Sequence, residues 1–284
     1  KNYTNMQQFV TALKSYGQHF LNDKDVLQHI LDIIKIYNKN EKIVEIGPGM
    51  GALTTYLIKE FPELTCVEVD KRCIEFLNIK YKTQDPNVKV TIVDADFLKL
   101  NLKEWIQSPT AIVGNFPYNI SSQIIFRIID NFEMIPFMVG MFQKEMAVRI
   151  ASKHGSKEYG VISVLTQLYY DVKVEFDILP GSFSPPPKVM SSVISLKRKE
   201  NIAIDFDVVL FKKIVKAGFS QRRKMLRNGL SHQGLHVAGA RDVSAKEPSL
   251  AARISNRLRD ALTCGGVDVI DDDACALGRQ PQGD

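Results

Sequence analysis

One segment near the start of the chain combines a strand pattern, a glycine loop and a helix pattern. Residues 42–46 form a short apolar strand pattern that runs into Gly47-Pro48-Gly49-Met50-Gly51, and residues 52–58 follow with helical spacing. A strand, a glycine turn and a helix in this order begin a doubly wound sheet, where glycines let the backbone approach a nucleotide. We therefore expect an α/β fold with a mostly parallel sheet.

Polar residues follow two later strand patterns at what should be the same edge of this sheet. The pattern over residues 65–70 contains Glu68 near its end, and the pattern over residues 88–93 is followed by Asp96. An acid at the first position can bind two ribose hydroxyls, and an Asp at the second can accept from an adenine amine, although it can also serve only as a turn residue. NAD and S-adenosylmethionine both carry these groups, and the loop suits either, so both cofactors remain open.

The stretch Asn115-Phe116-Pro117-Tyr118 follows the apolar run 111–113 and favours one of these cofactors. The Asn115 side-chain oxygen and the Pro117 carbonyl can both accept from an exocyclic amine, while the Tyr118 ring stacks on the base that carries it. Asn and Pro are also ordinary turn residues. An enzyme that uses NAD has no evident use for such a stretch, whereas methyl transfer from S-adenosylmethionine to an amine requires that the amine be oriented. The stretch therefore favours S-adenosylmethionine.

Composition excludes several classes of protein. The 284 residues are 45% hydrophobic and 24% charged, which suits one full-sized domain and one smaller domain. No apolar run is long enough to span a bilayer and the start lacks a signal-peptide pattern, so we expect a cytoplasmic protein without membrane contact. The four cysteines have no metal-ligand spacing, so neither a metal site nor a disulfide is expected. The net charge is +5, because residues 1–230 carry +7 and residues 231–284 carry −2, and this basic excess is compatible with an RNA partner.

Short segments spread over most of the chain occur in the order typical of one protein family. They are Gln18-His19-Phe20-Leu21, Val44-Glu45-Ile46-Gly47-Pro48-Gly49, Val67-Glu68-Val69-Asp70, Asn115-Phe116-Pro117-Tyr118, Gln143-Lys144-Glu145, Tyr159-Gly160, Phe183-Ser184-Pro185-Pro186-Pro187-Lys188-Val189 and Phe219-Ser220-Gln221-Arg222-Arg223-Lys224. In this order they resemble the KsgA family of small-subunit rRNA adenine dimethyltransferases, relatives of the Erm enzymes of large-subunit rRNA. The resemblance covers about residues 16–230.

This resemblance implies a Rossmann-like methyltransferase sheet, S-adenosylmethionine as the cofactor, and a role for particular residues. Those matching the cofactor site are His19, Leu21, Gly47, Gly49, Glu68, Asp96 and Asn115. Those matching the target-adenine site are Asn115, Pro117, Tyr118 and Phe183, with Tyr118 and Phe183 on opposite faces of the base. On residues alone, His19 could instead be a packed or capping residue. Phe116 stands where Leu is commoner, and we expect its side chain to point into the core.

The implied reaction is transfer of two methyl groups to each of two adjacent adenines near the 3′ end of 16S rRNA, in an immature small ribosomal subunit. The amine needs orientation more than deprotonation, so no general base is expected. A monomer is expected. The basic run Arg222, Arg223, Lys224 and Arg227 would contact RNA phosphates, although such a run is often only a solvated helix face.

Three regions are expected along the chain. Residues 1–200 would form the methyltransferase domain with an antiparallel last strand, and residues 201–230 would begin a small helical RNA-binding domain. The resemblance stops near residue 231, so residues 231–284 form an atypical tail that is frameshifted, fused or divergent. Two alternative functions remain at this stage: an Erm-like enzyme acting on large-subunit rRNA, and a ribosome-assembly factor without catalysis.

Overall fold

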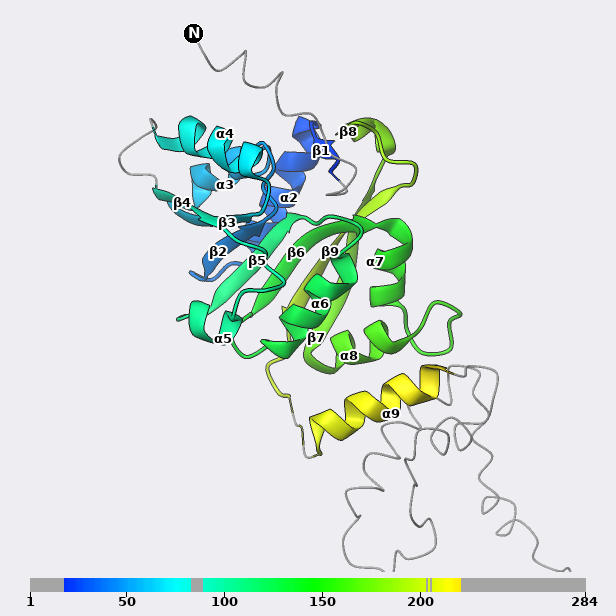
Figure 1. Cartoon of the computed structure of the whole chain (residues 1–284). Helices are drawn as coiled ribbons and strands as arrows, with labels where there is room; N and C mark the ends of the chain where they lie inside the picture. The colour runs from blue at the N-terminus through cyan, green and yellow to red at the C-terminus, as the bar shows by residue number, and fades with distance from the viewer. Residues whose placement is uncertain (1–17, 83–88, 203, 205, 221–284) are drawn as a thin grey trace, which may run out of the picture. The chain divides into compact units, whose positions relative to one another are not determined.

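The computed structural model of the chain describes residues 18–82, 89–202, 204 and 206–220 (Figure 1). The chain divides into two compact units. The first comprises Lys1–Ala151 and Thr166–Ile202, and the second comprises Ser152–Leu165 and Ala203–Asp284.

A seven-stranded sheet forms the centre of the first unit, in the order β4-β3-β2-β5-β6-β9-β7. The strands from β4 to β6 pair in parallel, whereas β9 pairs antiparallel with both β6 and β7. Their bounds are β2 Lys42–Ile46, β3 Glu63–Glu68, β4 Lys89–Asp94, β5 Thr110–Asn115, β6 Phe137–Gln143, β7 Tyr170–Ile178 and β9 Ser191–Arg198. This confirms the expected mostly parallel sheet with an antiparallel strand at residues 192–196.

Helices follow the strands along the chain and cover the sheet (Figure 1). Helix α2 begins after Asp23, whose carboxylate accepts from the backbone N–H of Asp25 and Val26, as expected for a residue that caps a helix. Its buried face joins a cluster with residues of β2, β3, β5 and β6. The helices of the first unit, with α8 shared between the units, are α2 Lys24–Tyr37, α3 Thr54–Glu60, α4 Lys71–Lys82, α5 Leu102–Trp105, α6 Ser121–Asp130, α7 Lys144–Ala151 and α8 Val161–Tyr169.

Strands β5 and β6 pair through two glycines, Gly114 opposite Gly140. The ring of Phe116 fills the space beside them, and a Cβ added at Gly140 would overlap this ring. Phe116 is 1% exposed and meets Phe142 edge to face, with 5.2 Å between ring centroids. The expectation that Phe116 points into the core is therefore confirmed.

A second, two-stranded sheet joins the start of the described chain to a segment far along it. β1 (Phe20–Leu21) pairs antiparallel with β8 (Phe183–Ser184), and the short 3-10 helix η2 (Pro180–Ser182) precedes β8. Backbone and side-chain hydrogen bonds extend this connection: Asn22 N–H donates to the Ser182 carbonyl, and the Ser182 hydroxyl donates to Asp23. Residues 18–21 are thereby held beside the loop that follows β7.

In the second unit, the helix expected near residue 205 is α9 (Val208–Ser220). Phe211, Ile214 and Val215 are buried as expected, but Val209 is 63% exposed and does not belong to the apolar face. Val209 lies two residues before Phe211, so the helical turn places the two side chains about 200° apart. The expected RNA-binding residues Arg222, Arg223, Lys224 and Arg227, and the tail 231–284, lie outside the described residues. No helix among the described residues is long and apolar enough to cross a bilayer.

Candidate active site

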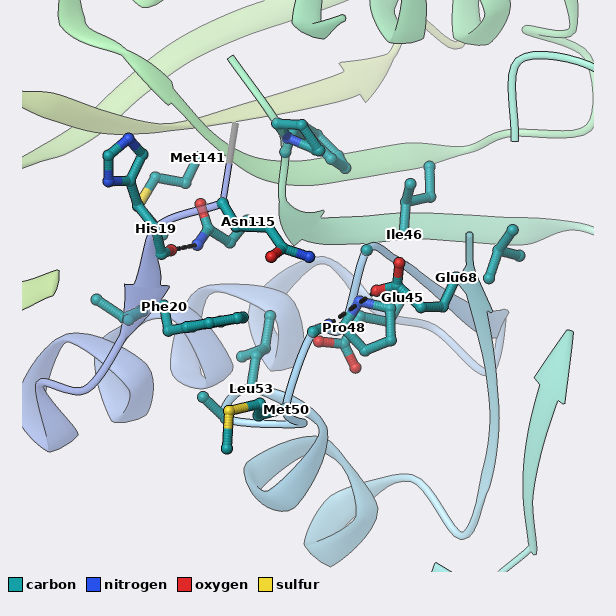
Figure 2. Close-up of a pocket in the computed structure, with 18 of the residues that line it drawn as sticks. His19, Phe20, Glu45, Ile46, Pro48, Met50, Leu53, Glu68, Asn115 and Met141 are labelled. Carbon is teal, nitrogen blue, oxygen red and sulfur yellow. Dashed lines mark hydrogen bonds between the residues drawn. The ribbon is translucent and has the colours of Figure 1, made fainter. Parts of the chain in front are cut away.

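A cavity of about 480 Å³ lies at the carboxyl ends of β2, β3, β4 and β5, with residues 18–21 forming part of its wall (Figure 2). Here the strand order reverses between β2 and β5, which is where doubly wound sheets bind their ligands. All residues expected to hold the cofactor line this cavity: His19, Leu21, Gly47, Gly49, Glu68, Asp96 and Asn115.

The glycine loop after β2 can exist only with glycine at its key positions. Gly49 has φ +57° and Gly51 has φ +74°, a left-handed conformation that side chains rarely adopt. A Cβ at Gly49 would lie 3.0 Å from the Phe20 ring, and one at Gly51 would lie 2.7 Å from the Tyr81 hydroxyl oxygen. Gly49 therefore lines the cavity with bare backbone beside the side chains of Pro48 and Met50, whereas Gly51 lets the loop pack against α4.

Glu68 ends β3 and presents a carboxylate that the backbone already orients. Its Oε2 accepts from Gly49 N–H at 3.0 Å, while Oε1 accepts from the N–H groups of Val69 and Asp70 at 2.8 and 3.0 Å. Burial raises the pKa of Glu68, and these three donors offset part of that effect. A carboxylate has about four lone-pair directions, so one remains on Oε2 for a hydroxyl donor in the cavity.

Asp96, after β4, is both a turn residue and a cavity residue. Its Oδ1 accepts from Leu98 N–H at 2.9 Å, and Oδ2 lies 3.6 Å from the Nζ of the exposed Lys99. The turn interpretation of this Asp is thus confirmed, and the remaining lone pairs leave it able to accept from an adenine amine as well.

The side-chain amide of Asn115, at the end of β5, has a defined orientation. Its Nδ2 donates to the His19 carbonyl at 2.8 Å (Figure 2). A carbonyl oxygen can only accept, so the nitrogen must face His19 and the Asn115 Oδ1 is left to accept from another group. The backbone of His19 therefore decides which atom of Asn115 is offered to a substrate amine.

Tyr118 is held by contacts on its ring and on its hydroxyl. The imidazole of His19 stacks on the ring with 5.5 Å between centroids and 27° between planes. His19 is itself fixed by a 2.8 Å hydrogen bond from Nδ1 to the Pro185 carbonyl. The Tyr118 hydroxyl lies 2.6 Å from the Ser191 hydroxyl, and burial raises the pKa of the phenol, which therefore stays neutral.

Comparison with known proteins accounts for this combination of an oriented amide, an aromatic ring and a nucleotide cavity. Residues 10–259 match the model of the ribosomal RNA adenine dimethylases. The chain belongs to the ribosomal RNA adenine dimethylase family. As in other members of this family, the methyl donor is S-adenosylmethionine.

Relatives with high identity carry one name. The chain is 47% identical over 222 residues to ribosomal RNA small subunit methyltransferase A of Cytophaga hutchinsonii, covering 78% of this chain and 84% of the relative. It is 40% identical over 232 residues to the protein of that name in Porphyromonas gingivalis, covering 81% and 87%.

Solved structures show the same fold at lower identity. A dimethyladenosine transferase from Plasmodium falciparum superposes with a TM-score of 0.68 at 23% identity, covering 88% of this chain and 93% of that one. The 23S rRNA methyltransferase ErmE gives 0.63 at 24% identity, covering 84% and 99%.

The cavity suits S-adenosylmethionine, the methyl donor of this family, in size and in chemistry. Its volume lies within the range of about 300–1,000 Å³ that is typical of ligand pockets. Glu68 would bind the ribose hydroxyls and Asp96 would bind the adenine amine. The backbone of the glycine loop would lie against the nucleoside. Bare loop backbone and a buried, preoriented carboxylate are the features that such a ligand needs.

Two of the expected target-site groups have other contacts. The Pro117 carbonyl accepts from Ile120 N–H at 3.2 Å, which leaves one lone pair for a substrate amine. Phe183 is 3% exposed and belongs to the same buried cluster as Leu21, its partner in the β1–β8 pair. Unlike Tyr118, it is not among the cavity residues, because β8 pairing turns its side chain into the core.

Several residues that position the site were not found by sequence reasoning. Gln18 donates to Asp70 at 3.0 Å, and Arg72 donates to both oxygens of the same carboxylate. Burial alone would raise the pKa of Asp70, but the hydrogen bonds from Arg72 and Gln18 lower it to about 2. Asp70 thus stays ionised and ties residues 18–21 to the end of β3. Only the acid at the strand end could have indicated this link.

Proposed function

We propose that this chain dimethylates the exocyclic amines of two adjacent adenines in a loop near the 3′ end of 16S rRNA, within an immature small ribosomal subunit. It works as a monomer in the cytoplasm. Family membership supports the chemistry, and the names of the relatives with 40–47% identity support the choice of the small subunit over the Erm-like alternative.

The orientation of the Asn115 amide carries the proposal. Because Nδ2 is committed to the His19 carbonyl, Oδ1 accepts one proton of the adenine amine, and the second lone pair of the Pro117 carbonyl accepts the other. With both N–H bonds directed, the amine nitrogen lone pair leaves conjugation with the ring. It can then be aimed at an electrophile in the adjoining cavity.

Tyr118 supplies the stacking surface for the target adenine. Unstacking the adenine from its RNA loop costs about a few kcal/mol, and base–aromatic stacking offsets it by about 1–3 kcal/mol. Bound S-adenosylmethionine supplies an activated methyl group, so the chain needs to contribute alignment and exclusion of water more than proton removal. The neutral, half-buried phenol of Tyr118 fits a positioning role and not general-base catalysis.

We also propose that residues 1–200 form the methyltransferase domain, that residues 201–230 begin the helical RNA-binding domain, and that residues 231–284 are an atypical tail. Phe183 closes the second face of the target base after a movement of the β8 loop. The buried Phe183 side chain makes this movement necessary, because in the described conformation it faces the core.

The test is tritiated methyl transfer to small-subunit particles that lack the modification. Asn115→Ala and Tyr118→Ala should each lower kcat by about 100-fold or more, because the amine or the base loses its orientation. Asn78→Ala is a matched control: the Asn78 Nδ2 also donates to a backbone carbonyl, that of Ile74, but within α4 and outside the cavity.

Labelling of naked large-subunit RNA in place of the particle would support an Erm-like enzyme. Full function of Asn115→Ala in small-subunit maturation, with no methyl transfer by the wild type, would support an assembly factor without catalysis. Either result would reject the proposed function, whereas loss of activity in Asn78→Ala would reject only the assignment of Asn115.

A further inference from the structure

The Tyr118 hydroxyl and the Ser191 hydroxyl form a pair that the reaction does not use directly. Their oxygens are 2.6 Å apart, although the residues are 73 positions apart in sequence. Ser191 is fully buried at the first position of β9, and Tyr118 is in the turn after β5. A stacking residue needs only a ring, so the contact calls for a separate explanation.

We propose that Ser191 is a positioning residue that fixes the ring of Tyr118 for the target adenine. The inference rests on the proposed function and extends it to a residue that makes no contact with the substrate. A phenol side chain in a turn can swing about its Cα–Cβ bond, and a hydrogen bond at its far end fixes the direction of the ring axis. The base then meets a ring already in the stacking orientation.

The position of Ser191 is suited to this task because it is held from both sides. In the sheet register it lies opposite Gln143 of β6 and opposite Ile178 of β7. The residue before it is fixed as well, since Lys144 N–H donates to the Met190 carbonyl at 2.9 Å. The backbone that carries the Ser191 hydroxyl is therefore held by a strand on each side.

The Tyr118 ring has a second support, which remains in place when the hydroxyl contact is removed by substitution. His19 stacks on Tyr118 and is bonded through Nδ1 to the Pro185 carbonyl in the segment that leads into β9. Stacking restrains rotation of the ring about its own axis, whereas the hydroxyl contact fixes the direction of that axis and how far the ring reaches. Ser191 belongs to the same seven-stranded sheet as Asn115, so the hydroxyl contact ties the Tyr118 ring to the sheet that carries Asn115.

A purely structural role for the pair would have a different consequence. A buried hydroxyl that is merely satisfied contributes to stability, and its loss lowers stability without a specific effect on kcat. Ser192 provides that comparison: it is adjacent on β9, fully buried, and donates to the Asp177 Oδ1 at 2.6 Å. Ser191→Ala and Ser192→Ala remove the same atom from the same strand.

The experiment measures methyl transfer, cofactor affinity and thermal unfolding for the full chain. Ser191→Ala should lower kcat about tenfold, the rate equivalent of one lost hydrogen bond, with the Kd for S-adenosylmethionine changed by less than about twofold. Tyr118→Phe should give a similar loss, and the double variant should be no slower than the slower single variant. Ser192→Ala should lower the unfolding temperature without lowering kcat. Ser191→Cys, with a weaker donor of similar size, should fall between Ser and Ala.

Additive losses in the double variant, or equal kcat losses in Ser191→Ala and Ser192→Ala, would overturn the inference. If the wild type labels large-subunit RNA instead, the proposed function fails and the same comparison is made on that RNA. NMR of ring-labelled tyrosine in the cofactor-bound protein tests the inference without catalysis. The order parameter of the Tyr118 ring axis should be lower in Ser191→Ala than in the wild type or Ser192→Ala, and an unchanged value would reject the inference.

Discussion

Glu45 is a carboxyl group buried beneath the glycine loop, and its environment makes it sensitive to pH. It is 2% exposed, and its Oε2 accepts from the Thr54 hydroxyl at 2.6 Å, at the start of α3. Burial raises the pKa of Glu45 to about 7, and the hydrogen bond from Thr54 offsets only part of this. The cavity of the methyltransferase therefore has a wall residue whose charge changes near neutral pH.

The stability of the chain should fall as pH rises from about 4.5 to about 7. In this window the unfolded chain releases the Glu45 proton while the folded chain retains it, so folding binds a proton and is weakened by its removal. The loss is on the order of 3 kcal/mol. In Glu45→Gln the neutral amide still accepts from Thr54, so thermal unfolding at pH 5 and pH 8 should differ less than in the wild type.

Glu60→Gln serves as the control, because Glu60 is an exposed partner of Lys35 and should leave the pH profile unchanged. An equally steep pH dependence in Glu45→Gln and in the wild type would contradict the assignment. Burial also raises the pKa of Glu68, and its charge raises the pKa of Glu45, so the difference between the two proteins includes this interaction.

At the level of elements, strand pairing determines how the Asn115 turn is supported. Gly114 and Gly140 face each other in the β5–β6 pair, and the Phe116 ring occupies the room that their missing side chains leave. The turn that carries Asn115 and Tyr118 is anchored through this ring in the core. A larger residue at Gly140 would act on the active site through Phe116, whereas one at Gly114 would first meet the Ile46 carbonyl.

Gly140→Ala should lower the free energy of unfolding by about 1–3 kcal/mol, because the added methyl overlaps the Phe116 ring. Phe116→Leu alone should cost less than about 1.5 kcal/mol, as an apolar exchange in the core. In the double variant the smaller Leu should relieve the overlap, so its loss should be smaller than the two single losses together. Denaturant unfolding of the four proteins measures this, and strict additivity would show that the overlap is absorbed elsewhere.

At the level of the whole molecule, the cofactor site lies entirely in the first unit, whereas the expected RNA contacts follow α9 in the second. The cavity residues lie between Gln18 and Met141, and the basic run begins after Ser220. Net charge is +5, with the excess of basic residues before residue 231. Cofactor binding and particle binding should therefore respond to different substitutions.

Replacing Arg222 and Arg223 with Ala should weaken binding to small-subunit particles and leave cofactor affinity unchanged. If both contact phosphates, the slope of log affinity against log salt should decrease in magnitude by roughly 1–2. Filter binding at several salt concentrations measures it. A variant with Lys35→Ala and Lys59→Ala removes equal charge from α2 and α3, and an equal loss in that variant would contradict a specific role for the basic run.

Features of this protein that depend on neighbouring residues could be derived from the sequence. The strand, glycine loop and helix over residues 42–58, the Asp23 cap of α2 and the strand before Asn115 each leave a local pattern. The order of the short segments along the chain then identified the family and, through it, the residues that line the cavity. Such features are readable because backbone conformation and periodicity are set by residues a few positions apart.

The tertiary structure alone decided which atoms of the active-site side chains face the substrate. Asn115 takes its orientation from His19, 96 positions away, and Tyr118 from Ser191, 73 positions away. Strand β7 was missed although apolar and charged residues alternate regularly from Tyr170 to Ile178, a pattern that does indicate a half-buried strand. Phe183 faces the core in the described conformation because of its pairing with β1, so its proposed place at the target base requires the movement of the β8 loop. Contacts across such separations leave no periodic trace in the sequence, and only folding brings them together.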